Sequence, residues 1–343
     1  MKVTAAMSVA VMALAACGSS TESTPGASGT TSGAKTLKVG MAYDVGGRGD
    51  QSFNDAAAAG LDKAKADLGV VIKEATAVNG EPESSREERL QQLIDAGYTN
   101  VVAVGFAYAP AVKKVAAANP DAKIALIDST DAAGPNIESL TFAEQQGSFL
   151  VGAAAALKSK KGNIGFIGGV NTDLIKKFEA GYQAGAKAVN PAIKIQVKYL
   201  TQPPDFSGFG DPAKGKTAAE GMYQQGADVV YAAAGGSGGG VFTAATASGK
   251  MAIGVDSDQA LTAPPAVRAS IITSMIKKVD VATFDFIKSL TEGKFTAGTK
   301  VYDLKAGGVG YSTTGGKMDD IKAKLDVYQQ QIIDGKIVVP TKP

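Results

Sequence analysis

The chain has 343 residues, and its 35 Lys and Arg against 33 Asp and Glu give a formal net charge of +2. This near balance does not support a nucleic-acid-binding surface, and we expect no nucleic-acid partner. The sequence contains no His, no Trp and one Cys. These absences exclude Ser-His-Asp catalysis, His-ligated metals and a disulfide within the chain, and we expect neither a metal nor a cofactor.

The N-terminus has the features of a lipoprotein signal. Residues 5–16 form an apolar run that has the length of a signal-peptide core and is too short to span a bilayer. The run ends in Leu14-Ala15-Ala16-Cys17, which resembles a bacterial lipobox, where the Cys is acylated and becomes the mature N-terminus. Residues 17–36 are rich in Ser, Thr, Gly, Ala and Pro and predict a flexible tether. We expect residues 1–16 to be removed and Cys17 to anchor the chain to the extracytoplasmic face of the cell membrane.

The rest of the chain alternates short apolar runs with stretches of helical spacing. The runs rich in Val, Ile and Ala predict strands at 37–43, 70–76, 101–106, 123–127, 163–167, 193–200, 229–234, 252–255 and 270–274. Helices are predicted at 54–68, 83–96, 111–118, 173–189 and 277–290, and the apolar run 147–157 predicts a core helix. Such alternation predicts an α/β fold with parallel sheets covered on both faces. One large sheet would fit, but the length favours two lobes of similar size. We find no internal sequence repeat.

Polar residues follow several predicted strands. Asp44, Asp128, Gly235-Gly236 and Asp256 each end or follow such a run. Ligands of open parallel sheets bind outside the carboxyl ends of the strands, so these residues are candidates for one shared cleft. A single Asp in this position can also simply cap the next helix.

One motif points to a different chemistry. Residues 210–217 match the phosphate-binding pattern GxxxxGK[ST], which works only where it links a buried strand to a helix. The preceding residues 201–209 contain two Pro and one Gly, which makes a poor strand. We therefore predict a loop here, running into a helix that begins near Asp211-Pro212.

Four segments resemble one protein family and occur in its order. They are 44–54 (DVGGRGDQSFN), 165–169 with 176–182 (GFIGG, KKFEAGY), 233–242 (AAGGSGGGVF), and 254–259 with 273–280 (GVDSDQ, TSMIKKVD). They resemble the basic-membrane-protein family of substrate-binding lipoproteins, also called PnrA-like nucleoside-binding proteins. The resemblance covers nearly the whole chain after the tether. Residues 203–209 depart from it, because they add Gly and two aromatics where a shorter loop is expected, and could form a rim or a lid.

The resemblance implies a type I periplasmic-binding-protein fold, in which two Rossmann-like lobes close on a ligand in a central cleft. It implies that residues 37–145 and roughly 260–300 form the first lobe, 146–259 the second, and that 301–343 packs across both. The implied function is that of a monomeric receptor that captures a nucleoside, more often a purine, and delivers it to the permease subunits of an ABC importer.

The same resemblance assigns roles to residues of this chain. Phe53 and Phe178 would stack on the two faces of the base, and Asn54 and Asp128 would bond its edge. Asp256 and Lys277, at the head of the helix predicted at 277–290, would hold the ribose hydroxyls. Gly235 or Gly236 would let the backbone approach the ligand. Lys277 is preferred to its neighbour Lys278 on the family's S-x-x-K spacing alone.

Two other functions compete with a nucleoside receptor. A receptor for another small polar ligand, such as a sugar, would use the same carboxylates and rings, although sugar sites often contain Trp. A nucleoside-hydrolysing enzyme could use paired Asp residues, but the absence of His makes catalysis less favourable. We expect no enzymatic activity.

Overall fold

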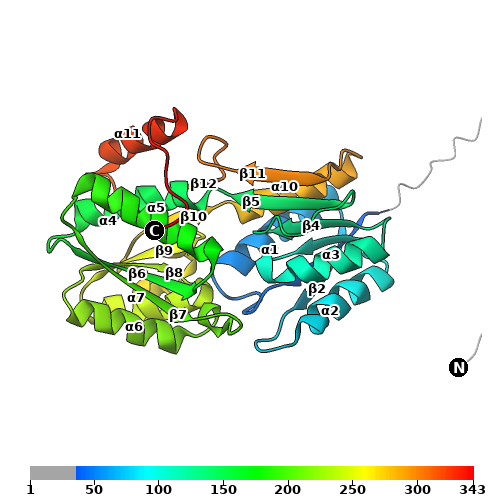
Figure 1. Cartoon of the computed structure of the whole chain (residues 1–343), viewed down its shortest axis with the longest axis horizontal. Coiled ribbons are helices and arrows are strands. Elements are labelled where there is room, and N and C mark those ends of the chain that lie inside the picture. The colour runs from blue at the N-terminus through cyan, green and yellow to red at the C-terminus, as the bar shows by residue number, and fades with distance from the viewer. Residues whose placement is uncertain (1–35) are drawn as a thin grey trace, which may run out of the picture. The chain divides into compact units, whose positions relative to one another are not determined.

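The computed structural model describes residues 36–343, which form one compact unit. Within it, two sheets lie side by side as two lobes (Figure 1). The first sheet contains β1 (Lys38–Tyr43), β2 (Val71–Thr76), β3 (Asn100–Ala103), β4 (Lys123–Ile127), β5 (Ile137–Phe142) and β11 (Gly298–Tyr302). The second contains β6 (Asn163–Val170), β7 (Lys194–Thr201), β8 (Val229–Ala233), β9 (Met251–Asp256), β10 (Ile271–Lys277) and β12 (Val309–Tyr311).

Helices cover the sheets on both faces, which is why central strands such as β8 are buried along their whole length. The longer helices are α1 (Phe53–Leu68), α2 (Glu83–Asp95), α3 (Ala109–Ala118), α4 (Glu144–Lys158), α5 (Asp173–Val189), α6 (Pro212–Gln224), α7 (Gly238–Ala247), α10 (Val279–Thr291) and α11 (Lys322–Ile333). The short ones are α8 (Gln259–Thr262) and α9 (Pro265–Arg268), with 3₁₀ turns η1 (Phe106–Tyr108), η2 (Ser207–Phe209), η3 (Gly235–Ser237) and η4 (Thr314–Gly316).

The predicted two-lobed α/β architecture is confirmed. Each strand expected from an apolar run is present, and the structure adds β5, β11 and β12. The first of these, IESLTF, was not expected because Glu and Ser interrupt its apolar pattern although all its residues but one are buried. The last two escaped detection because β11 is an exposed edge strand and β12 has three residues.

The expected lobe boundary requires a correction. The resemblance places residues from roughly 260 to 300 in the first lobe, but β10 pairs with β9 in the second sheet. Within residues 260–300, only α10, which packs on α1, and the start of β11, which pairs with β5, belong to the first lobe. The chain then returns to the second lobe, where β12 pairs with β10 and α11 packs on α4. Lys277 is therefore the last residue of a strand and does not head a helix.

Helices α4 and α5 pack with their backbones almost in contact. An added Cβ at Gly152 would lie 2.1 Å from the carbonyl oxygen of Tyr182, and one at Gly185 would lie 1.9 Å from that of Phe149. These glycines allow the apolar run 147–157 to become a core helix, as predicted. No helix within residues 36–343 is long and apolar enough to cross a membrane.

The two lobes repeat one strand order, although the sequence shows no repeat. Only the edge strands differ, since β11 runs parallel to β5 and β12 runs antiparallel to β10. The strand orders are β11-β5-β4-β3-β1-β2 and β12-β10-β9-β8-β6-β7, so β4 and β9 hold equivalent positions. Asp128 follows β4 and Asp256 ends β9, and both have positive φ, 69° and 63°. Non-glycine residues adopt this conformation rarely, and such strain is concentrated at functional sites.

Candidate ligand-binding site

A cavity lies between the lobes at the carboxyl ends of the central strands. It contains about 570 Å³ of empty space, including the part open to solvent. Its lining includes eight of the expected site residues: Asp44, Phe53, Asn54, Asp128, Phe178, Gly235, Asp256 and Lys277. Gly236 does not line it and borders a neighbouring hollow instead.

Lys277 is the buried cation at the centre of this site. Its side chain is 2% exposed, and Nζ lies 2.5 Å from Oδ2 of Asp128 and 3.4 Å from Oε1 of Glu144. The same ammonium group lies 5.0 Å from the ring centroid of Phe53 and 5.5 Å from that of Phe178. Burial alone would lower the pKa of Lys277, but the neighbouring carboxylates raise it overall, so the group stays charged.

Glu144 was not expected from the sequence. It begins α4, directly after the chain passes from the first lobe to the second, and is 1% exposed. Burial raises the pKa of Glu144, while Lys277 opposes the shift. No helical or strand-end pattern singled it out, because its partner Lys277 is distant in sequence.

Asp128 and Asp256 present carboxylates from equivalent strand ends. Oδ2 of Asp128 accepts a hydrogen bond from Lys277, and its buried Oδ1 has no partner among the described residues. Oδ2 of Asp256 accepts one from the hydroxyl of Ser52, at 2.7 Å. Because Ser52 precedes α1 in the first lobe, this bond joins the two lobes.

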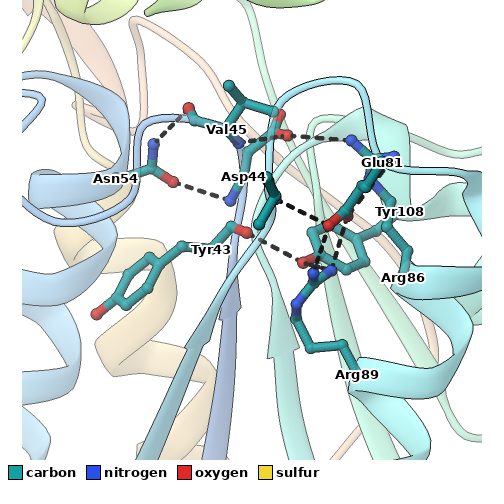
Figure 2. A network of polar contacts seen from close by, with 9 residues as sticks. Tyr43, Asp44, Val45, Asn54, Glu81, Arg86, Arg89 and Tyr108 are labelled. Carbon is teal, nitrogen blue, oxygen red and sulfur yellow. Dashed lines mark hydrogen bonds and ion pairs between the residues drawn. The ribbon is translucent and has the colours of Figure 1, made fainter.

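The loop 44–54 is held in shape by its own polar groups. Oδ1 of Asn54 accepts from the backbone N–H of Asp44 at 3.0 Å, and Nδ2 donates to the carbonyl of Val45 at 3.4 Å (Figure 2). Nδ2 also donates to Oδ2 of Asp50 at 3.0 Å. Asp50 in turn accepts from the backbone N–H of Ser52 and of Asn54. A hydrogen bond from Asn54 to a ligand would have to be shared with these contacts.

Aromatic rings form much of the apolar wall. Phe53, the first residue of α1, is half-buried, whereas Phe178 on α5 is 3% exposed and also belongs to the hydrophobic core. Two further rings line the cavity, Phe106 in η1 and Phe209 in η2. The strand-end rule could have found Phe106, which closes the run predicted at 101–106.

The loop 203–209 forms part of the rim. Its Phe206 packs edge-on against Phe106 of the other lobe, with ring centroids 5.8 Å apart and an interplanar angle of 69°. The loop is fixed to its own lobe by Ser237, whose hydroxyl donates to the carbonyl of Gly208 at 2.8 Å. An anchored rim therefore describes this loop better than a free lid.

The phosphate-binding pattern at 210–217 does not link a buried strand directly to a helix in this fold. The preceding strand β7 ends at Thr201, and η2 intervenes before α6 begins at Pro212. Asp211 caps this helix, accepting from the backbone N–H of Lys214 at 2.9 Å. The prediction of a loop running into a helix at this point is confirmed.

The site is rich in acceptors and poor in positive charge. Burial raises the pKa of Asp44 and of Asp256 to about 6 in each case. The backbone N–H of Val45 and the charge of Arg86 oppose the shift at Asp44. Lys277 and the hydroxyl of Ser52 oppose it at Asp256. Free carboxylate oxygens beside flat apolar rings suit a ligand with N–H and O–H donors and aromatic faces. They disfavour an anionic ligand, because like charges would be buried together. Among residues 36–343, no group of His, Cys, Asp and Glu side chains is arranged to hold a metal.

Known proteins resemble this chain along most of its length. The profile of the family described as "ABC transporter substrate-binding protein PnrA-like" matches residues 37–342. The chain is 36% identical to the "CD4+ T-cell-stimulating antigen" of Listeria innocua, covering 96% of this chain and 95% of that protein. It is also 36% identical to the "ABC transporter nucleoside-binding protein BmpA" of Lactococcus lactis, covering 92% and 93%. A solved solute-binding protein of an ABC transporter system from Aeropyrum pernix K1 is 31% identical with a TM-score of 0.78, over 89% of this chain and 94% of that one.

The raised pKa values of Asp44 and Asp256 predict how stability depends on pH. Below about pH 4 both carboxyls are protonated in the folded and the unfolded chain, and the full stability is present. As pH rises through about 6, the folded protein must ionise buried groups, and stability is lost. Because the chain has no His, no imidazole titrates in this window. The ligand-free protein should melt at a higher temperature at about pH 5 than at about pH 7.5.

Asp256→Asn should raise the melting temperature of the ligand-free protein at about pH 7.5 and flatten its pH dependence, since one buried charge is removed at a gain of about 1–3 kcal/mol. Asp121→Asn, in an exposed turn, is the control and should change neither property. An Asp256→Asn protein less stable than wild type at this pH would contradict the interpretation.

Proposed function

Because the chain belongs to the PnrA-like family of ABC transporter substrate-binding proteins, we propose that it captures a nucleoside, preferably a purine nucleoside, and delivers it to the permease subunits of an ABC importer. The observation that carries the proposal is the pairing of aromatic and acidic groups in one cavity. Phe53 and Phe178 reach it from different lobes, and Asp128 and Asp256 reach it from equivalent strand ends.

The base lies between the rings of Phe53 and Phe178. Stacking of a base on an aromatic side chain is worth about 1–3 kcal/mol and tolerates any base, because each has a π-face. Asp44 and Asp128 accept hydrogen bonds from N–H groups on the edge of the base, and Asn54 shares its amide with that edge. The buried and unpartnered Oδ1 of Asp128 supports this assignment, because an unused buried acceptor calls for a donor.

The ribose lies toward Asp256 and Lys277. A carboxylate can accept hydrogen bonds from both hydroxyls of a vicinal diol, and charge-assisted bonds are the stronger kind. Only one oxygen of Asp256 is engaged by Ser52 among the described residues, which leaves the other for a hydroxyl. Gly235, with φ of 54°, lets the backbone come close to the sugar, and Gly236 supports the same turn.

The charge of the cavity favours a neutral ligand. Asp44, Asp50, Asp128 and Asp256 line it, and Lys277 is the lining cation. Because Lys277 is already paired with Asp128 and Glu144, it is poorly placed to neutralise a phosphate. An uncharged nucleoside, with its N–H and O–H donors, matches this acceptor-rich surface.

The protein acts as a monomeric receptor and does not catalyse a reaction. Ligand in the cleft adds contacts from both lobes at once and so favours the closed arrangement, a shift set by its differential affinity. In cells, residues 1–16 are removed and the lipid on Cys17 holds the protein on the outer face of the membrane. Cys17 and the tether lie outside the described residues.

The central experiment measures binding and chemical stability of the ligand together. Guanosine, inosine, adenosine and adenine, with arabinose and ribose, are titrated against soluble protein that lacks residues 1–17. Nucleosides should bind far more tightly than adenine or the sugars, and guanosine should be recovered intact by chromatography after hours with stoichiometric protein. Equal affinity for adenine and adenosine would contradict a ribose subsite. Tighter binding of the sugars than of the nucleosides would indicate a sugar receptor. Steady release of free base would show that the protein is an enzyme.

Phe53→Leu should weaken guanosine binding by about 1–3 kcal/mol, because the stacking ring is lost while apolar volume is largely kept. Phe295→Leu is a matched control, since Phe295 is also partly buried in the first lobe but does not line the cavity. Calorimetric titration measures both variants. Unchanged affinity in Phe53→Leu would show that Phe53 is a packing residue only.

Cys17→Ser should leave the full chain unanchored or unprocessed, because acylation requires the thiol. Membrane fractionation and the mass of the mature N-terminus measure the outcome. Normal cleavage with full membrane retention of this variant would exclude the proposed anchor.

A further inference from the structure

Arg86 lies behind the ligand cavity, next to Asp44. It is on α2 and 6% exposed, and it does not line the cavity. Its Nη2 lies 3.9 Å from Oδ1 of Asp44, its Nη1 lies 3.9 Å from Oε1 of Glu81, and its guanidinium lies over the ring of Tyr108 at 5.7 Å. Its buried Nε has no hydrogen-bond partner among the described residues. A buried guanidinium with such loose contacts adds little as a hydrogen-bond donor, so its main effect on its surroundings is its charge.

Glu81 does not neutralise the charge of Arg86, because its carboxylate is already paired with a second arginine. Arg89, one helical turn further along α2, lies 2.6 Å from Oε2 of Glu81 and also donates to Oε1 at 2.9 Å. Arg89 donates as well to the hydroxyl of Tyr108, which donates to the carbonyl of Tyr43 at 3.0 Å. Figure 2 shows this network on one side of Asp44 and Asn54 on the other. The network joins α2 to the end of β1 and leaves Arg86 as the cation beside Asp44.

Asp44 has one oxygen toward the protein and one available to a ligand. Oδ1 accepts from the backbone N–H of Val45 at 2.8 Å and faces Arg86. Oδ2 lies beside Gly105, which also lines the cavity, and receives no hydrogen bond from the described residues. A side chain at Gly105 would collide with Oδ2, since an added Cβ would lie 2.5 Å away.

Four further titratable groups surround Asp44, and two of them oppose its ionisation. Asp128 at the end of β4 and Glu81 before α2 are acidic and raise its pKa. Tyr108 in η1 faces it, and Asp50 lies on the far side of Asn54 in the same loop. Arg86 is the cation that acts against these groups and against burial.

We propose that Arg86 is a positioning residue for ligand recognition: its charge keeps Asp44 ionised and holds Oδ1, so that Oδ2 is presented to the ligand as a carboxylate acceptor. This inference rests on the proposed function, in which Asp44 accepts a hydrogen bond from the bound nucleoside. Arg86 itself does not touch the ligand.

The test follows guanosine affinity from about pH 5 to pH 9 in wild type, Arg86→Met and Arg86→Lys. In wild type, affinity falls as pH drops through about 6, because Asp44 is protonated. In Arg86→Met the midpoint of this fall moves up by about one pH unit or more, so that affinity at pH 7 drops several-fold to about tenfold and returns toward the wild-type value at about pH 9. Arg86→Lys restores the wild-type midpoint. Arg86→Gln replaces Arg86→Met if the latter does not fold.

A merely structural role for Arg86 gives a different result. It predicts a loss of affinity that is the same at every pH, or lower thermal stability with an unchanged midpoint, and either outcome overturns the inference. In an Asp44→Asn background, Arg86→Met should no longer move the midpoint. A shift that persists there would assign the titration to another group, such as Asp256, and would also refute the proposal.

A second readout needs no ligand. The carboxyl carbon of Asp44, identified by its absence from the carbon-13 spectrum of Asp44→Asn, is titrated in wild type and in Arg86→Met. The inference requires a higher midpoint in the variant, and equal midpoints overturn it. If wild type binds no guanosine at any pH, the proposed function fails while this titration still decides whether Arg86 controls Asp44.

Discussion

A single buried ammonium group organises the centre of this protein. Lys277 lies at the point where the chain passes from β10 to α10, and it contacts Asp128 of the first lobe and Glu144 at another crossing between the lobes. Removing the ammonium would leave these acids buried without a partner, a loss that typically costs several kcal/mol. The aromatic rings of Phe53 and Phe178 lie around the same cation. Charge balance, lobe connection and the walls of the cavity therefore all depend on one side chain.

The repeated topology explains why the site has matching halves. Equivalent strands bring Asp128 and Asp256 to the cavity with the same unusual backbone conformation. Gly105 and Gly235, two residues beyond the ends of β3 and β8, also have positive φ. The two halves nevertheless carry different chemistry, since Asp128 is paired with a lysine and Asp256 with a serine. A symmetric frame thus supports an asymmetric site, as the proposed nucleoside, with its unlike base and ribose, would require.

Without ligand, the buried carboxyls of the site lower the stability of the folded protein. Asp44 and Asp256 are buried carboxyls whose raised pKa values record the unfavourable environment of their charges. Contacts across the cleft counteract this, among them Ser52 with Asp256 and the edge-on pair of Phe106 and Phe206. A bound ligand that supplies the missing hydrogen-bond donors would stabilise these carboxylates most.

The sequence by itself determined the α/β alternation and the position of Asp44, Asp128 and Asp256 at strand ends. Through the resemblance it also singled out Phe53, Phe178 and Lys277, which line the same cavity. These were accessible because strand periodicity is local and because parallel strands end at one edge of a sheet. Tertiary structure alone decided that Lys277 ends a strand and that Phe209 lines the cavity. It also decided that Glu144 lies beside Lys277 and that Arg86 lies beside Asp44. A partner far away in the chain leaves no local pattern, and the charge of a buried group depends on every neighbour that folding brings within a few ångströms.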